Sequence, residues 1–233
     1  MTLDVSATSR FKREAAERAV ELIQPGMVVG LGTGSTAAFA VRRLAVLRAE
    51  GHLLDVVGVP TSIETERLAR ELGVPLTTLE ARPEVDLTLD GADEVAPDFS
   101  LIKGAGGAML REKVVAQASR REVIVVDAAK LSPCLGARAR VPVEVVPMAL
   151  RVEARFLESL GAQAVPRVGA DGALFLTDQG NPVLDCAFGP IAQPVELAAR
   201  LDARAGILAH GLFLGLATDV VVAGPDGVVL RSR

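Results

Sequence analysis

The sequence lacks tryptophan and tyrosine, and it contains only two cysteines and two histidines. Cys134 and Cys186 show neither CxxC nor CxxH spacing, and His52 lies far from His210, so we expect no metal site. No apolar run reaches the ~18 residues of a membrane span, and the first residues hold no apolar core of a signal peptide. These absences predict a cytoplasmic protein with no membrane partner.

An excess of positive charge is also missing, because 25 Lys and Arg face 29 Asp and Glu. The resulting net charge of −4 disfavours a nucleic-acid partner, whose binding surface is normally basic. Lysine itself is scarce, since only four of the 25 basic residues are lysines: Lys12, Lys103, Lys113 and Lys130. Lysine is a compact charge with a tunable pKa, so its retention indicates a specific requirement at these positions; chance is the alternative.

What is present favours a well-packed globular protein. The chain has 233 residues, of which 50% are hydrophobic, and a chain of this length buries roughly 70% of the surface that its unfolded form exposes. In the first half, apolar strand-like segments such as 27–31, 53–59 and 123–126 alternate with helical segments such as 35–49. This alternation predicts an α/β fold with a parallel sheet covered on both faces.

The pattern changes after about residue 133, where short strands such as 173–176, separated by glycine-containing turns, predict a small α+β lobe. Two later β segments, 207–216 and 220–229, are expected to rejoin the main sheet. The domains that we expect are therefore a larger lobe over 1–133 and 206–233 and a smaller lobe over 134–205.

A glycine-rich turn over 30–34 follows the first predicted strand, and the next helix begins with Ser35-Thr36. Glycine permits close approach of the backbone, and the free amides at a helix N-terminus favour phosphate. A tight turn with a helix cap is the alternative. The turn does not match a dinucleotide fingerprint, which needs glycine where Ser35 stands, or a P-loop, which needs lysine after Gly34. The motif therefore indicates a phosphate but not a nucleotide.

Charged residues follow the ends of other predicted strands. The segment DGADE over 90–94 ends one strand, KGAGG over 103–107 precedes a helix that contains Glu112, and Lys130 follows another strand. Ligand sites of parallel sheets lie at the carboxyl ends of the strands. Three neighbouring acids repel one another, which suggests a polyhydroxylated ligand or a cation; the alternatives are a plain acidic turn and, for Glu112, a solvated helix residue.

Taken together, the blocks GLGTGSTA, VPTS, LDGADE, IKGAGGAMLREK, VVDAAK, VPVEVVP and TDQGNPVLD resemble the successive signatures of type A ribose-5-phosphate isomerases. The resemblance extends from about Lys12 to Gly227, and Ala105 is its one visible departure, in a loop that is often all glycine. It implies a Rossmann-like parallel-sheet domain with a smaller ferredoxin-like α+β lobe. It also implies a homo-oligomer, either a dimer or a tetramer, that requires no metal and no organic cofactor.

The resemblance also implies the roles of individual residues. Glu112 matches the catalytic base, Asp90 and Asp93 match the sugar-binding loop, and Lys103 matches the start of the second substrate-binding turn. We expect Asp90 or Asp93 to move the hydroxyl proton when the furanose opens and Lys103 to stabilise charge on the carbonyl oxygen, so these three join Glu112 as catalytic candidates. The residues expected to bind substrate are Lys12, Thr33, Gly34, Ser35, Thr36, Asp90, Gly91, Ala92, Asp93, Lys103, Gly104, Ala105, Gly106 and Lys130.

The implied activity is that of an aldose-ketose isomerase, which interconverts D-ribose 5-phosphate and D-ribulose 5-phosphate through an enediolate in the non-oxidative pentose phosphate pathway. One alternative is another enzyme on a similar scaffold, such as an amino-sugar phosphate deaminase or a CoA transferase. A deaminase would need a histidine-assisted ring opening, and neither histidine lies in a motif. A second alternative is a sugar-phosphate sensor without turnover; such regulators normally carry a DNA-binding segment, which we do not expect here.

Overall fold

The computed structural model describes residues 5–233 and divides into two compact units. The first comprises Met1–Ala92, of which residues 1–4 lie outside the described part, with Arg111–Lys130 and Gly215–Arg233. The second comprises Asp93–Leu110 and Leu131–Leu214. Residues 93–110, 131–133 and 206–214, which we expected in the larger lobe, thus group with the second unit.

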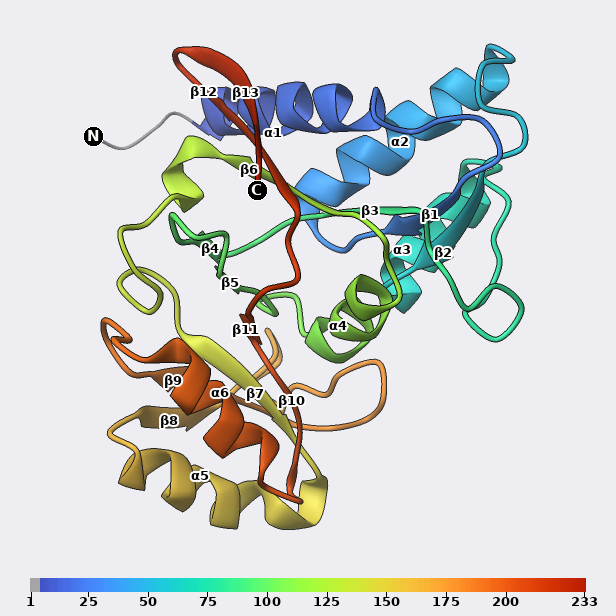
Figure 1. Cartoon of the computed structure of the whole chain (residues 1–233). Helices are drawn as coiled ribbons and strands as arrows, with labels where there is room; N and C mark the ends of the chain where they lie inside the picture. Colours follow the sequence, from blue (N-terminus) through green and yellow to red (C-terminus); the bar gives the residue numbers. More distant parts are fainter. Residues whose placement is uncertain (1–4) are drawn as a thin grey trace. The chain divides into compact units, whose positions relative to one another are not determined.

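The first unit contains a six-stranded sheet with the strand order β13-β12-β6-β3-β1-β2 (Figure 1). Every neighbouring pair is parallel except β12 and β13, which form an antiparallel hairpin at one edge. The strands are β1 Val28–Leu31, β2 Val57–Pro60, β3 Leu87–Asp90, β6 Glu122–Asp127, β12 Asp219–Gly224 and β13 Gly227–Ser232. The helices are α1 Val5–Val20, α2 Ser35–Ala49, α3 Ile63–Glu71, the short 3-10 helix η1 Ala128–Lys130 and α4 Met109–Gln117, whose first two residues group with the second unit.

Alternation along the strands explains why helices pack on both faces of this sheet. Val29 and Leu31 of β1 belong to one buried cluster with α1 and α2, whereas Val28 belongs to another with Val115 of α4. Successive side chains of a strand point to opposite faces, so an apolar strand must be covered twice. Three alanines of α1, Ala15, Ala16 and Ala19, are fully buried in this cluster.

An ion pair joins the beginnings of β6 and β12. The guanidinium of Arg121 donates through Nε and Nη2 to the two carboxylate oxygens of Asp219, each at 2.8 Å. The hydroxyls of Thr218 and Ser232 also donate to this carboxylate. Mainly because of the Arg121 hydrogen bonds, and against the opposing effect of burial, the pKa of Asp219 is lowered from 3.8 to about 2.

The second unit contains a four-stranded antiparallel sheet with the order β10-β7-β9-β8. With the helices α5 and α6 the chain order is β-α-β-β-α-β, the ferredoxin-like arrangement that the resemblance implied. The elements are β7 Val141–Val145, η2 Pro147–Ala149, α5 Leu150–Ser159, β8 Gln163–Pro166, β9 Val183–Ala187, α6 Pro194–Asp202 and β10 Ile207–His210. Leu157 of α5 and Leu201 of α6 are fully buried in its core.

A smaller antiparallel sheet in the second unit has the order β11-β5-β4, formed by β4 Glu94–Val95, β5 Leu101–Ile102 and β11 Leu212–Phe213. The prediction that 207–216 rejoins the main sheet is therefore wrong, because β10 pairs with β7 and β11 with β5. Segment 220–229 does join the main sheet, as predicted, through β12 and β13. Long-range pairing partners decide where such a segment goes, and a local pattern does not contain them.

Candidate active site

The first glycine turn joins β1 to α2 in the first unit. Gly34 has a φ of 94°, in the left-handed region that favours glycine. Its neighbour Ser35 begins α2, and the Lys12 ammonium of α1 donates to the Ser35 hydroxyl at 3.0 Å. The free amides of the first helical turn, the half-buried Thr36 and the charge of Lys12 thus lie at one helix N-terminus. This arrangement suits the binding of an anion such as phosphate.

Asp90, at the end of β3, packs directly against this turn. It is fully buried, and its Oδ1 accepts hydrogen bonds from the amides of Thr33 at 3.1 Å and Gly91 at 2.7 Å. A Cβ on Gly32 would lie 2.3 Å from the same oxygen. The Thr33 hydroxyl lies 2.7 Å from the hydroxyl of Thr61, a residue that follows β2. The turn and the end of β3 therefore fix each other in position.

Glu112 lies in the first turn of α4 and is 5% exposed. The interpretation as a solvated helix residue is therefore wrong. A carboxylate near a helix N-terminus is favoured by the helix dipole, while burial disfavours its charged form. Such an environment is typical of a carboxylate that transfers protons.

The second glycine turn lies in the second unit, together with Asp93 and Lys103. The Ala105 amide donates to Asp93 Oδ2 at 2.9 Å, and the Lys103 amide donates to the Gly211 carbonyl at 2.9 Å. Lys103 is 2% exposed, with its ammonium 5.5 Å from the centre of the Phe213 ring. Burial of an ammonium indicates a functional or structural requirement for its charge.

The departure at Ala105 costs little. Among the described residues, Phe99 is the only non-glycine residue with a positive φ, of 65°. Ala105 therefore has an ordinary backbone conformation that a methyl group tolerates, whereas Gly104, with a φ of 101°, needs to be glycine.

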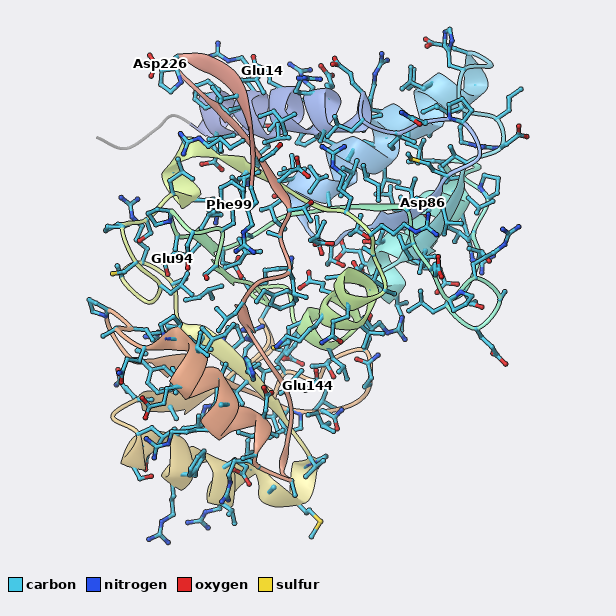
Figure 2. The ribbon with its side chains drawn as sticks, in the orientation of Figure 1. Glu14, Asp86, Glu94, Phe99, Glu144 and Asp226 are labelled. Atoms are coloured by element: carbon cyan, nitrogen blue, oxygen red, sulfur yellow. The ribbon has the colours of Figure 1, made fainter. Side chains whose placement is uncertain are left out.

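Glu94, the third acid of the DGADE segment, has a different environment (Figure 2). It is fully buried, and its carboxylate accepts the amides of Gly136 at 2.8 Å, Arg138 at 3.0 Å and Ala139 at 3.2 Å. These bonds hold the 136–139 loop of the same unit. The repulsion expected among three neighbouring acids is thus offset for Glu94 by amide donors rather than by a ligand or a cation.

The predicted site residues consequently form two groups. In the first unit, hydrogen bonds join Lys12 to Ser35 and Thr33 to Asp90, and in the second unit one joins Asp93 to Ala105. Lys130 lies on η1, half-buried, and its side chain forms no hydrogen bond or ion pair within residues 5–233. The remaining predicted residues are Gly91, which donates to Asp90, the half-buried Ala92, and the exposed Gly106.

Two residues at these turns were not predicted. Thr61 lies in the VPTS block, so the resemblance contained its signal. Arg167 donates from Nη1 to the carbonyls of Gly104 at 3.0 Å and Ala105 at 2.9 Å. It lies more than 60 residues from them in sequence, outside any motif that we identified.

Neither a metal cluster nor a membrane span is found in the described part of the chain. Across residues 5–233, no three His, Cys, Asp or Glu side chains are grouped so that they could hold a metal ion. No helix among these residues has both the length and the apolar character to cross a membrane.

Comparisons with known proteins agree with the resemblance seen in the sequence. Residues 57–227 match the family model described as ribose 5-phosphate isomerase A (phosphoriboisomerase A). Ribose-5-phosphate isomerase A of Chloroflexus aurantiacus is 58% identical over 226 residues, covering 97% of this chain and 95% of the relative.

Two solved structures share the whole fold. A D-ribose-5-phosphate isomerase in complex with phospho-erythronic acid superposes with a TM-score of 0.95 at 35% identity, covering 97% of this chain and 99% of that one. Ribose 5-phosphate isomerase A of Methanocaldococcus jannaschii gives a TM-score of 0.91 at 38% identity, covering 97% and 100% of the two chains. The predicted fold class is thereby confirmed, and the chain belongs to the ribose 5-phosphate isomerase A family.

Proposed function

We propose that this chain, an isomerase by family, interconverts D-ribose 5-phosphate and D-ribulose 5-phosphate through an enediolate, with Glu112 as the general base. The reaction belongs to the non-oxidative branch of the pentose phosphate pathway. The observation that carries the proposal is the burial of Glu112, only 5% exposed in the first turn of α4. A carboxylate in such surroundings can accept the proton from C2 of the aldose and return it to C1.

The phosphate of the substrate binds, in this proposal, at the N-terminus of α2. The Lys12 ammonium supplies a charge, Ser35 and Thr36 supply hydroxyl groups, and the first amides of the helix complete the donors. Lys130 contributes a further charge. Binding at this remote group holds C1 and C2 against the base, so that part of the barrier is overcome through orientation.

Negative charge develops on the carbonyl oxygen as the proton leaves C2, and this charge needs preorganised donors. The buried Lys103 ammonium is one. In the second glycine turn, the amide of Ala105 donates to Asp93 and that of Gly107 to the Gly104 carbonyl. The amides of Gly104 and Gly106 donate to no other group in the described part of the chain, and we assign them as the remaining donors.

The furanose ring must open before isomerisation, and we assign movement of the hydroxyl proton to Asp90 or Asp93. Both carboxylates are oriented by backbone amides through one oxygen. In Asp93 the other oxygen, Oδ1, accepts no hydrogen bond within residues 5–233.

We further propose that the chain binds phospho-erythronic acid, as the solved relative does. Its carboxylate carries negative charge, as the enediolate does, so the donors around Lys103 favour it. We also propose that the protein is cytoplasmic and that it forms a homo-oligomer, either a dimer or a tetramer, as the resemblance implies.

The test is conversion of ribose 5-phosphate by the native chain and by Glu112→Gln, both in excess chelator. We expect turnover by the native chain and a loss of about 10²–10⁴-fold in kcat for the variant, the usual contribution of a general base. Glu158→Gln, at an exposed position of α5, is the matched control and should keep native activity. A folded native chain that binds the sugar phosphate without converting it would refute the proposal and favour a sensor.

A further inference from the structure

The guanidinium of Arg167 joins the second glycine turn to the body of the second unit. Its Nη1 donates to the carbonyls of both Gly104 and Ala105, at 3.0 and 2.9 Å. Its Nε and Nη2 donate to the two carboxylate oxygens of Asp185 on β9, at 2.9 and 2.5 Å. The Arg167 and Asp185 side chains are 13% and 23% exposed. The donors of Arg167 are thus largely engaged within the protein, and its charge is balanced by Asp185.

The orientation of the Gly104 and Ala105 carbonyls determines where the amides of Ala105 and Gly106 point. In a trans peptide the C=O and the following N–H point in opposite directions, and the chain has no cis peptide among its described residues. With both carbonyls turned to Arg167, the amides of Ala105 and Gly106 face away from it. The Ala105 amide meets Asp93 Oδ2 at 2.9 Å. The Gly106 amide, one of the proposed donors to the substrate oxygen, therefore points to the same side of the turn as Asp93.

Phe175 fixes Arg167 from a second direction. The guanidinium carbon lies 5.4 Å from the centre of the Phe175 ring, and the Phe175 amide donates to the Arg167 carbonyl at 2.9 Å. A Cβ on Gly107 would lie 2.5 Å from carbons of the same ring, so this glycine allows the ring its position. The Arg167 guanidinium, the Phe175 ring and the second glycine turn therefore pack against one another.

We propose that Arg167 is a positioning residue for the isomerase reaction: it orients the peptide planes of the second glycine turn, and through them Asp93 and the Gly106 amide. This inference rests on the proposed function. Arg167 itself does not contact substrate. A point charge does not replace it, because the role requires one planar group that donates to two carbonyls and to a carboxylate at once.

The experiment compares Arg167→Lys with Arg155→Lys, an arginine at an exposed position of α5 in the same unit. We expect Arg167→Lys to lower kcat by about 10²-fold, the usual cost of a misplacement of about 1 Å, with a much smaller change in KM. Its affinity for phospho-erythronic acid should fall, while its affinity for inorganic phosphate stays native, because phosphate binds at α2. Arg155→Lys should match the native chain in kcat, in KM and in both affinities.

Turnover by the native chain and its loss in Glu112→Gln test the proposed function separately. When both are as expected, a folded Arg167→Lys with native kcat and native affinity for phospho-erythronic acid overturns the role of Arg167 alone. An Arg167→Lys variant that has a lower Tm but keeps native kcat and native affinity for phospho-erythronic acid also overturns this role. Should Arg167→Lys not fold, Asp185→Asn, which leaves Arg167 in the chain but weakens its anchor, should lower kcat in the same direction, and native kcat in that variant overturns the inference.

Discussion

The adjacent acids Asp93 and Glu94 offer a sharp test of which carboxylates serve the reaction. The change is Glu94→Gln, with Asp93→Asn as its matched counterpart. Glu94 accepts three backbone amides from the 136–139 loop, whereas Asp93 accepts one amide, that of Ala105. The first carboxylate therefore stabilises a loop, and the second has an oxygen available for substrate.

The loss of stability in Glu94→Gln can be estimated from the three hydrogen bonds that the Glu94 carboxylate accepts. A glutamine at position 94 presents an NH2 group to at least one amide donor and loses the charge that strengthens the other bonds. Hydrogen bonds to a charged group contribute about 1.5–3 kcal/mol each, so we expect Glu94→Gln to lower the free energy of unfolding by about 3 kcal/mol. For a chain of this size that corresponds to a fall in Tm of about 6–12 °C.

Unfolding is best followed by circular dichroism, because the chain contains neither tryptophan nor tyrosine. At a temperature where both variants are folded, Glu94→Gln should keep a native kcat/KM. Asp93→Asn should lower kcat by about 10²-fold, which is the lower end of the usual contribution of a proton-transfer group. Its Tm should change little. A native Tm together with a large loss of kcat in Glu94→Gln would refute this assignment of roles.

Two further predictions concern the first unit. The pKa of Asp219 is about 2 in the folded chain, mainly because of its hydrogen bonds with Arg121, and 3.8 in the unfolded chain. The unfolded chain therefore binds a proton more tightly, so stability falls as the pH falls. About 2 kcal/mol of the free energy of unfolding is lost between about pH 4 and pH 2. Urea unfolding should accordingly show a larger loss for Asp219→Asn at pH 7 than at pH 3, and equal losses would contradict the ion pair as its cause. Gly32→Ala should lower the free energy of unfolding by about 1–3 kcal/mol, since the new Cβ would lie 2.3 Å from Asp90 Oδ1. It should also lower kcat, because Asp90 would be displaced. Thermal unfolding and turnover measure both effects, and native kcat would contradict the role of that contact.

The local pattern predicted the regular elements of the first unit well, and one failure shows its limit. The helix predicted at 35–49 is α2 with the same bounds, because a glycine turn fixes its start. The strand predicted at 53–59 is found only as Val57–Pro60. Arg48 explains this shortening, since its Nη1 donates to the carbonyls of Leu53 at 2.7 Å and Val56 at 2.9 Å. A side chain from the preceding helix thus takes carbonyls that a longer strand would have paired.

The second unit was harder to predict for a related reason. The strand expected at 173–176 forms only isolated bridges, Val168 with Leu174 and Leu176 with Pro182. Glu144 lies on β7 (Figure 2). It is fully buried and accepts a hydrogen bond from the Thr177 hydroxyl at 2.8 Å. A polar contact over 33 residues therefore holds part of this segment where the pattern suggested ladder pairing.

Site residues could be predicted where the chemistry of a ligand or of a turn requires a particular residue type. They could not be predicted where the role of a residue depends on a partner far away in sequence. The glycine turns and the acids at strand ends are visible locally, and the resemblance supplied Lys12. Glu94 and Arg167 differ, because their roles depend on which amides and carbonyls the fold turns toward them. Composition cannot separate Glu94 from the two acids beside it.

The scarcity of lysine acquires a physical meaning from these contacts. Three arginines each donate through Nε and Nη2 to both oxygens of one carboxylate: Arg121 with Asp219, Arg167 with Asp185 and Arg204 with Glu153. A planar fork fixes its partner in one geometry, which suits groups that must not move. Lys12 and Lys103 instead carry a single nitrogen, at the N-terminus of α2 and over Phe213. A compact charge on a flexible stem can follow a substrate whose charge shifts during the reaction, so this chain uses arginine for structure and retains lysine where we propose that the sugar phosphate binds.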